Sequence, residues 1–94
     1  MIKVVAKSKV KADNLDTVLN LYEELVQATR KEEGCIVYEL YQDVEDPCVL
    51  SMIEEWEDKA SLDAHMKTEH FTRIVPLVGK FVIESSLDIY NRVF

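Results

Sequence analysis

The stretch CIVYELYQDVEDPCVLSMIEEW, residues 35–56, decides the fold. Side chains alternate between two faces through residues 35–43 and again through 48–56, and a period of two is typical of β-strands. Glu45-Asp46-Pro47 lies between the two runs as a turn signal, so the stretch predicts an antiparallel hairpin. The expected register brings one face together: Ile36, Tyr38, Leu40, Leu50 and Met52. A slip of one residue would exchange the two faces.

The residues before the hairpin predict a strand followed by a helix. Residues 2–10 alternate and are rich in β-branched side chains, which indicates a strand. Apolar residues then recur at helical spacing over residues 15–29, which predicts an amphipathic helix. We expect Asp13 to cap this helix, with Asp16 in its first turn. Gly34 is expected to supply the left-handed residue after the helix ends.

The residues after the hairpin predict a broken helix and a last strand. Asp58 is the expected N-cap of the helix. Its buried stripe is expected to contain three residues: Leu62, His65 and Met66. Helical spacing resumes after a break and continues over residues 70–78, and we expect Pro76 and Gly79 to end it. Residues 81–90 alternate again, which indicates a strand.

The order β-α-β-β-α-β predicts an α+β fold of the ferredoxin-like class, with one antiparallel sheet and both helices on one face. We expect residues 1–94 to form a single domain. The other face of the sheet would mix apolar and charged side chains: Lys3, Val5, Lys7, Val37, Glu39, Tyr41, Val49, Ser51, Ile53, Val82 and Glu84. A half-solvated sheet could carry such a face. It also suits packing on a second copy, which would enlarge a small core, and we therefore predict a homodimer.

Composition and charge argue against several classes of partner. The formal net charge is −7 at pH 7, whereas nucleic acids and anionic membranes require a basic surface. No apolar run approaches the roughly 18 residues that span a membrane, and the N-terminus lacks a signal-peptide pattern. We therefore expect a cytoplasmic protein with no nucleic-acid or membrane partner. Cys35 and Cys48 lie at opposite ends of the hairpin, too far apart for a disulfide, and are expected to be reduced.

Two ionisable residues are expected on the helix-covered face of the sheet. Glu54 shares a strand face with Trp56, and His65 would point from its helix toward both of them. A buried carboxylate is costly unless it is paired or protonated, and a buried imidazole can move a proton near neutral pH. Both residues also have structural explanations. Glu54 could meet a helix-end donor or the register could be wrong, and His65 could be a core histidine bonded to a backbone carbonyl.

The remaining candidates are aromatic walls and a metal site. Trp56 and Tyr38 could line a pocket for an aromatic molecule, or they could simply fill the core. His65 and His70 are five residues apart and so do not share a helix face, and Glu69 would bring the number of ligands near His65 to only two. We therefore predict no metal site.

Four short stretches carry a resemblance to a known family: EGCIVYEL at 33–40, DP at 46–47, EEWED at 54–58 and AHMKTEHF at 64–71. They resemble the antibiotic-biosynthesis-monooxygenase domain family, which includes small quinol-monooxygenase-like proteins. The resemblance covers essentially the whole chain and implies a ferredoxin-like monomer that pairs face to face into a dimeric α+β barrel. Three loops or caps depart from the family's usual Lys-Pro-Gly, Glu-Pro-Gly and Thr-Pro-His: Lys11-Ala12-Asp13, Glu32-Glu33-Gly34 and Thr68-Glu69-His70.

The resemblance also implies an activity in a pocket between sheet and helices. Some members oxidise a quinol or another small phenolic substrate with O₂ and without a cofactor. An electron-rich phenolate itself reduces O₂, so the protein needs only to deprotonate, hold and desolvate it. On this hypothesis His65 is the acid/base group and Glu54 orients or tunes it. The implied substrate-binding residues are Trp56, Tyr38, Met52, His70 and Phe71.

Other functions stay open on the same fold. Similar haem-degrading monooxygenases pair a first-strand Asn with a Trp and a helix His, and the first strand here has no Asn, which disfavours haem degradation. Other relatives isomerise small phosphorylated sugars or ketones in signal-molecule turnover. A non-catalytic dimer that binds a small molecule, or one that protects or scaffolds a partner, would also fit the sequence.

Overall fold

The computed structural model describes all residues, 1–94, as one sheet with its helices packed against it. The elements are β1 (Ile2–Val10), the short 3₁₀-helix η1 (Ala12–Asn14), α1 (Leu15–Thr29), β2 (Cys35–Gln42), β3 (Val49–Trp56), α2 (Lys59–His65), α3 (Glu69–Gly79) and β4 (Val82–Asn91). The strands begin and end within one residue of their predicted bounds. None of the helices has both the length and the apolar character that crossing a membrane requires.

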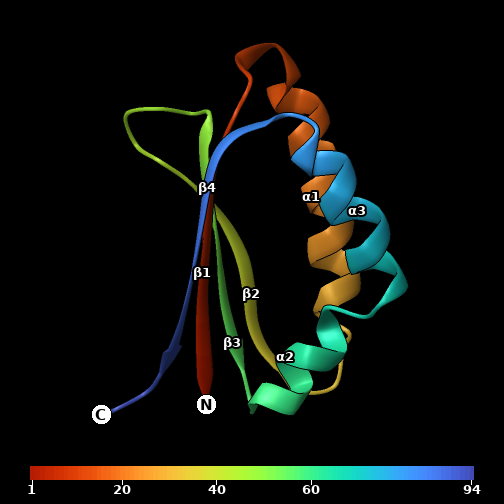
Figure 1. Ribbon diagram of the computed structural model, residues 1–94, viewed down its shortest axis with the longest axis vertical. Coiled ribbons are helices and arrows are strands. Elements are labelled where there is room, and N and C mark those ends of the chain that lie inside the picture. The colour runs from red at the N-terminus through yellow and green to blue at the C-terminus, as the bar shows by residue number, and fades with distance from the viewer.

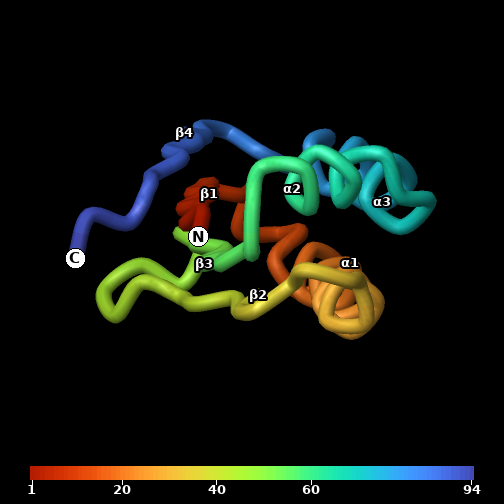
Figure 2. Tube along the Cα trace, turned by 90° about the horizontal axis from the view of Figure 1, so that it is seen from below, coloured from red at the N-terminus to blue at the C-terminus, as the bar shows by residue number.

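The sheet has the strand order β2-β3-β1-β4, and every neighbouring pair is antiparallel. All helices lie on one face of it (Figure 1). Seen from below, α1 lies on the side of β2 and α3 on the side of β4, with α2 between the sheet and the start of α3 (Figure 2). The prediction of an α+β, ferredoxin-like fold with helices on one face is therefore confirmed.

The core lies between the helices and the inner face of the two central strands. Every second residue of β3 is buried, in the predicted phase: Leu50, Met52, Glu54 and Trp56. Val4 and Val10 of β1 complete this face, and Ile74 and Val78 of α3 cover it. Because the period of two placed Glu54 on this face, a carboxyl group is built into the core.

The hairpin register is as predicted except at its start. Tyr38 lies opposite Glu54 and Leu40 opposite Met52, so these side chains share the inner face. The register shifts between Cys35 and Val37, which is a β-bulge. The bulge turns Ile36 outward, where it is 49% exposed, so its predicted place in the core is wrong.

A second bulge changes one residue of β4. The pairing of β1 with β4 shifts between Lys9 and Val10, and Val82 then lies opposite the buried Val10. Val82 packs against the core, so its predicted place on the outer face is wrong. The extra residue of a bulge reverses the alternation of the residues beyond it, and no local pattern in the sequence marked this point.

The start of α1 and the end of α3 also differ from expectation. Asp13 lies inside η1 rather than at the N-cap of α1, which is Asn14. Pro76 lies inside α3, which continues to Gly79 and buries Ile74 and Val78 on one face. The packing of that face outweighs the backbone hydrogen bond that a proline lacks.

The expected cap at Asp58 is confirmed, and Gly34 has the expected conformation but not the expected position after α1. The Asp58 carboxylate accepts a hydrogen bond from the Ser61 backbone N–H at 2.8 Å, as an N-cap does. Gly34 has the left-handed φ of +85°, although it lies in the turn before β2 and not directly after α1. A Cβ atom on Gly34 would lie 2.1 Å from Ser61 Oγ, so this turn packs closely against α2.

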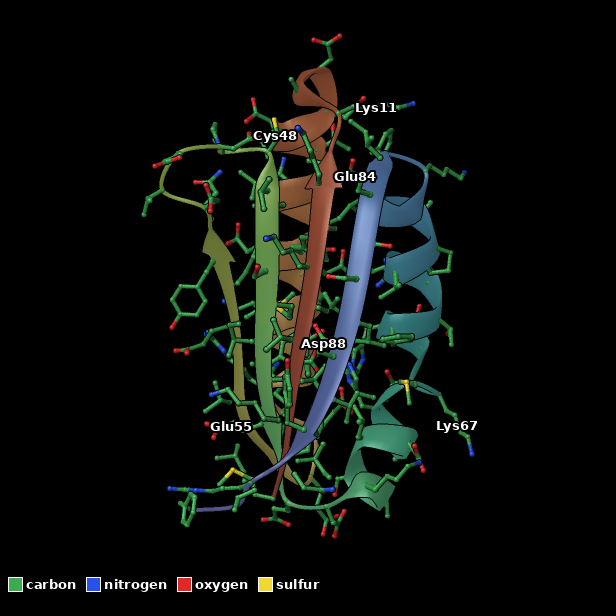
Figure 3. All side chains as sticks on the ribbon, turned by 60° about the vertical axis from the view of Figure 1, so that its left-hand side comes forward. Lys11, Cys48, Glu55, Lys67, Glu84 and Asp88 are labelled. Atoms are coloured by element: carbon green, nitrogen blue, oxygen red, sulfur yellow. The ribbon has the colours of Figure 1, made fainter.

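The outer face of the sheet carries no helix (Figure 3). Charges of opposite sign lie on neighbouring strands there: Lys3 of β1 is opposite Glu55 of β3, and Lys9 of β1 is opposite Glu84 of β4. Val5 and Ile53 lie opposite each other at the centre and are only half-buried. The mixture of apolar and charged residues predicted for this face is present.

Candidate functional site

An apolar cavity of about 210 Å³ lies between the helices and the inner face of the sheet. Apolar side chains and two phenols line most of it, with Glu54 and His65 as its ionisable carboxyl and imidazole: Val4, Ala6, Tyr22, Leu25, Tyr38, Met52, Glu54, Leu62, His65, Met66, Phe71, Val75, Leu87 and Ile89. Leu87 and Ile89 belong to β4 and are 61% and 53% exposed, so the cavity opens at this strand. A larger hollow on the surface beside Lys7 and Lys9 is lined mainly by polar residues.

His65 ends α2 and is 1% exposed. Its ring packs against three aromatic rings, with centroid separations of 4.7 Å to Trp56, 5.3 Å to Tyr38 and 5.0 Å to Phe71. α2 can place a polar ring so deeply because Leu62, one turn earlier on the same face, is buried against the sheet. His65 therefore lies on the buried stripe of its helix, as predicted.

The carboxylate of Glu32 joins two histidines. Its Oε2 lies 2.8 Å from Nδ1 of His65 and 2.6 Å from Nε2 of His70. A carboxylate can only accept, so both ring nitrogens donate their protons to it. His65 then carries its proton on Nδ1, and its Nε2, which is buried without a hydrogen-bond partner, keeps a free lone pair.

The surroundings of His65 favour the neutral ring. Burial lowers the pKa of His65 below its ordinary value of 6.5, and the hydrogen bond and charge of Glu32 partly oppose this. His65 is therefore neutral at pH 7, which makes its free nitrogen available as a base inside the cavity.

Glu54 has a different partner and a different state. The indole Nε1 of Trp56 donates to Oε1 of Glu54 at 2.9 Å, between residues that share one face of β3. Burial raises the pKa of Glu54 from 4.5 to about 7. At neutral pH a large fraction of this carboxyl group is protonated and can donate a hydrogen bond. Burial likewise raises the pKa of Tyr22 and of Tyr38, so the cavity wall holds neutral hydroxyl groups.

The predicted site residues divide between the cavity and its support. Glu54, His65 and three of the predicted binding residues line the cavity, the three being Tyr38, Met52 and Phe71. Trp56 lies behind it, where it bonds Glu54 and packs on His65. His70 bonds Glu32 and lies outside the cavity lining.

One predicted contact is absent. The hydrogen bond that orients His65 is made with Glu32 and not with Glu54, because Glu32 bonds Nδ1 while Glu54 bonds the indole. The alternative, that Glu54 tunes His65, stays a prediction. Glu32 lies in the turn before β2, 33 residues before His65, and no periodic pattern links the two. Tyr22 was also missed as a cavity residue, although its place on the apolar stripe of α1 pointed inward.

Glu32, His65 and His70 are the only group of three potential metal ligands that lie close together. The ligating atoms of Glu32, His65 and His70 all lie within 4.8 Å of one another. The sequence had suggested only Glu69 as a carboxylate near the two histidines. In the structure Glu69 bonds Arg73 instead.

Comparisons with known proteins agree on one family. Residues 1–77 match the model of the family described as antibiotic biosynthesis monooxygenase. "Putative monooxygenase YcnE" of Bacillus subtilis (strain 168) is 35% identical over 95% of this chain and 93% of its own. "Probable quinol monooxygenase YgiN" of Escherichia coli (strain K12) is 29% identical over 95% of both chains. A crystal structure of an antibiotic biosynthesis monooxygenase is 44% identical over 99% of both chains, with a TM-score of 0.95.

Proposed function

This chain belongs to the antibiotic biosynthesis monooxygenase family, and we propose that it oxidises a small quinol or other phenol with O₂ in the cavity beside His65. The observation that carries the proposal is the buried Nε2 of His65, which has a free lone pair and no partner in the protein. An orphaned buried acceptor in an apolar cavity costs free energy unless a ligand satisfies it. A phenolic hydroxyl group is a donor of the right kind.

The cavity limits the size and polarity of the substrate. Its volume of about 210 Å³ is below the roughly 300–1,000 Å³ of sites for drug-sized ligands, so one or two fused rings fit. Its walls are mostly apolar and aromatic, which suits a flat aromatic body. The hydroxyl groups of Tyr22 and Tyr38 and the carboxyl group of Glu54 provide donors for the substrate's oxygen atoms.

The proposed reaction begins with proton transfer. Nε2 of His65 takes the proton of a phenolic hydroxyl, and the Glu32 carboxylate stabilises the imidazolium that forms. The phenolate that remains is electron-rich and is held away from water, so it can pass electrons to O₂. For a quinol, one oxygen atom enters the ring and the other leaves as water, which gives a hydroxyquinone. The substrate supplies all four electrons, so the balance needs no further reductant.

The test is O₂ consumption by the purified, chelator-treated protein with a panel of quinols and polyphenols. We expect uptake that falls by about 100-fold or more in His65→Ala, because a positioned general base contributes about 10²–10⁴-fold. Added imidazole should restore part of the rate by filling the space of the lost ring. Glu33→Gln, an exposed acid beside Glu32, is the matched control and should behave as wild type.

The outcomes separate this proposal from others. Uptake that is the same in His65→Ala and in wild type would contradict the role of His65. Absence of uptake with every substrate would contradict the monooxygenase proposal, and would direct work to an isomerase or to a protein that binds a small molecule without converting it.

We also propose that two copies of the chain pair through the outer faces of their sheets. Val5 and Ile53 at the centre of this face are only half-buried. Lys3 of β1 lies opposite Glu55 of β3, and Lys9 of β1 lies opposite Glu84 of β4. A two-fold arrangement can then place lysines of one copy against acids of the other, as interfaces with complementary charge do. Sedimentation equilibrium should give the dimer mass for wild type and the monomer mass for Ile53→Lys. A monomeric wild type would contradict this.

A further inference from the structure

The cluster of Glu32, His65 and His70 brings together three ligating groups from three separate segments. Glu32 lies in the turn before β2, His65 ends α2 and His70 lies in the first turn of α3. The turn at Gly34 packs closely on α2, which holds the carboxylate at the histidines. The ligating atoms lie within 4.8 Å of one another. No two of these residues form a local motif, so the fold alone assembles the cluster.

The donor set selects among metal ions. Two imidazoles and one carboxylate are a ligand set that Zn²⁺ uses in three-ligand sites, whereas Mg²⁺ and Ca²⁺ prefer oxygen ligands. The side chains of Glu32 and His70 are partly exposed, at 13% and 17%, so an ion can enter from solvent and keep a water as its fourth ligand. The formal net charge of −7 also attracts cations.

Small movements would convert the hydrogen-bonded cluster into a metal site. Zinc lies about 2.0–2.2 Å from nitrogen and oxygen ligands, so tetrahedral ligand atoms lie about 3.3 Å apart. The separations of 2.8 Å and 2.6 Å from Oε2 of Glu32 would have to open by about 0.5–0.7 Å, and the two ring nitrogens, which lie within 4.8 Å of each other, would have to approach to about 3.3 Å. Glu32 is in a turn and His70 in the first turn of a helix, where side chains can adjust by this amount more easily than in the core.

We propose that Glu32, His65 and His70 bind Zn²⁺, and that bound zinc inhibits the protein by blocking the base in the cavity. The inhibitory part of this proposal rests on the proposed function, whereas the binding part does not. Zinc takes the lone pair on Nδ1 of His65, so the proton of that nitrogen moves to Nε2. His70 likewise binds zinc through the lone pair of Nε2, which first gives up the proton that it donates to Glu32. Nε2 of His65 then carries a proton, so it is a donor that cannot accept a phenolic proton.

Zinc binding is measured first, without substrate, by competition of the metal-free protein with a chromogenic zinc chelator at pH 7. We expect one equivalent of Zn²⁺ to bind, and Mg²⁺ in excess not to displace it. Mutation of a residue that only hydrogen-bonds a metal ligand typically lowers metal affinity by about 10–100-fold. Loss of a ligand itself should cost at least as much, so Glu32→Gln and His70→Gln should each weaken zinc binding by at least about tenfold. Glu33→Gln is the matched control and should bind as wild type.

Two further readouts test the proposal independently of variant folding. In wild-type protein, the ¹⁵N resonances of His65 and His70 should move on addition of Zn²⁺ and return on addition of a chelator. Zinc should also abolish the O₂ uptake of the active protein reversibly. Absence of a zinc equivalent, equal binding by His70→Gln, or unmoved histidine resonances would overturn the site. Zinc that binds while O₂ uptake continues would overturn only the proposal that zinc inhibits the protein. Absence of O₂ uptake before zinc is added would refute the proposed function and, with it, the proposal of inhibition.

Discussion

Replacing Glu54 with glutamine tests how the buried carboxyl group is held in the core. Burial raises the pKa of Glu54 from 4.5 to about 7, with the indole of Trp56 partly opposing the rise. Between pH 4.5 and pH 7 the folded chain therefore binds more protons at this group than the unfolded chain does. The free energy of unfolding of the wild type falls through this window as pH rises, because stability falls wherever the folded state binds more protons. Glu54→Gln cannot titrate and loses this dependence.

The size of the effect follows from the pKa difference. A rise from 4.5 to about 7 corresponds to about 3 kcal/mol, because each pKa unit is worth about 1.36 kcal/mol. About 2.5 kcal/mol of this falls between pH 5 and pH 8. The difference in unfolding free energy between Glu54→Gln and wild type should therefore grow by about 2.5 kcal/mol, in favour of the variant, from pH 5 to pH 8.

Urea unfolding at the two pH values measures this difference, with Trp56 as the single tryptophan reporter. Any constant cost of the amide cancels, since only the change with pH is compared. Glu55→Gln makes the same chemical change on the opposite face of β3 and is the matched control. A Glu54→Gln difference that stays constant, within about 0.5 kcal/mol, would refute the assignment of Glu54 as a buried acid that is protonated near neutral pH.

Two further changes test the support of the site. Glu32→Gln keeps the shape of the side chain but removes the charge that stabilises the imidazolium of His65. The kcat/KM for a quinol should therefore fall by about 10²-fold. An unchanged kcat/KM would exclude Glu32 from positioning the base. Gly34→Ala places a Cβ 2.1 Å from Ser61 Oγ at a φ of +85° and should cost at least about 1–2 kcal/mol in urea unfolding. Gly79→Ala meets no atom within 4 Å and should stabilise the chain by about 0.5–1 kcal/mol, and a loss of the same size at both glycines would contradict this account.

Much of the fold could be predicted because strand periodicity and turn chemistry are local. The alternation along β3 predicted the buried face that carries Glu54 and Trp56, and the structure has it in the same phase. Asp58 could be identified as an N-cap because the cap acts within its own first turn. Ile36 and Val82 were misplaced because bulges reversed the alternation next to them. A bulge is set by how strands pair across the sheet, which one strand's sequence does not show.

The site could be predicted only in part, for a related reason. His65 was found from the helical stripe that buries it, and Tyr38 and Met52 from the alternation of their strands. Glu32 was missed because it lies in a turn, where side chains follow no period, and meets His65 only through tertiary packing. The hydrogen bond from Trp56 to Glu54 could have been predicted, because residues two apart in a strand share a face.

The measurement that tests the central claim most directly is the mass of the product formed under ¹⁸O₂ by wild type and by His65→Ala. The proposed reaction predicts a hydroxyquinone that carries one ¹⁸O atom, labelled water in equal amount, and a yield that depends on His65. An unlabelled quinone with hydrogen peroxide as the other product would show that the cavity does not transfer oxygen to its substrate. Equal labelling by both proteins would show that His65 is not the base.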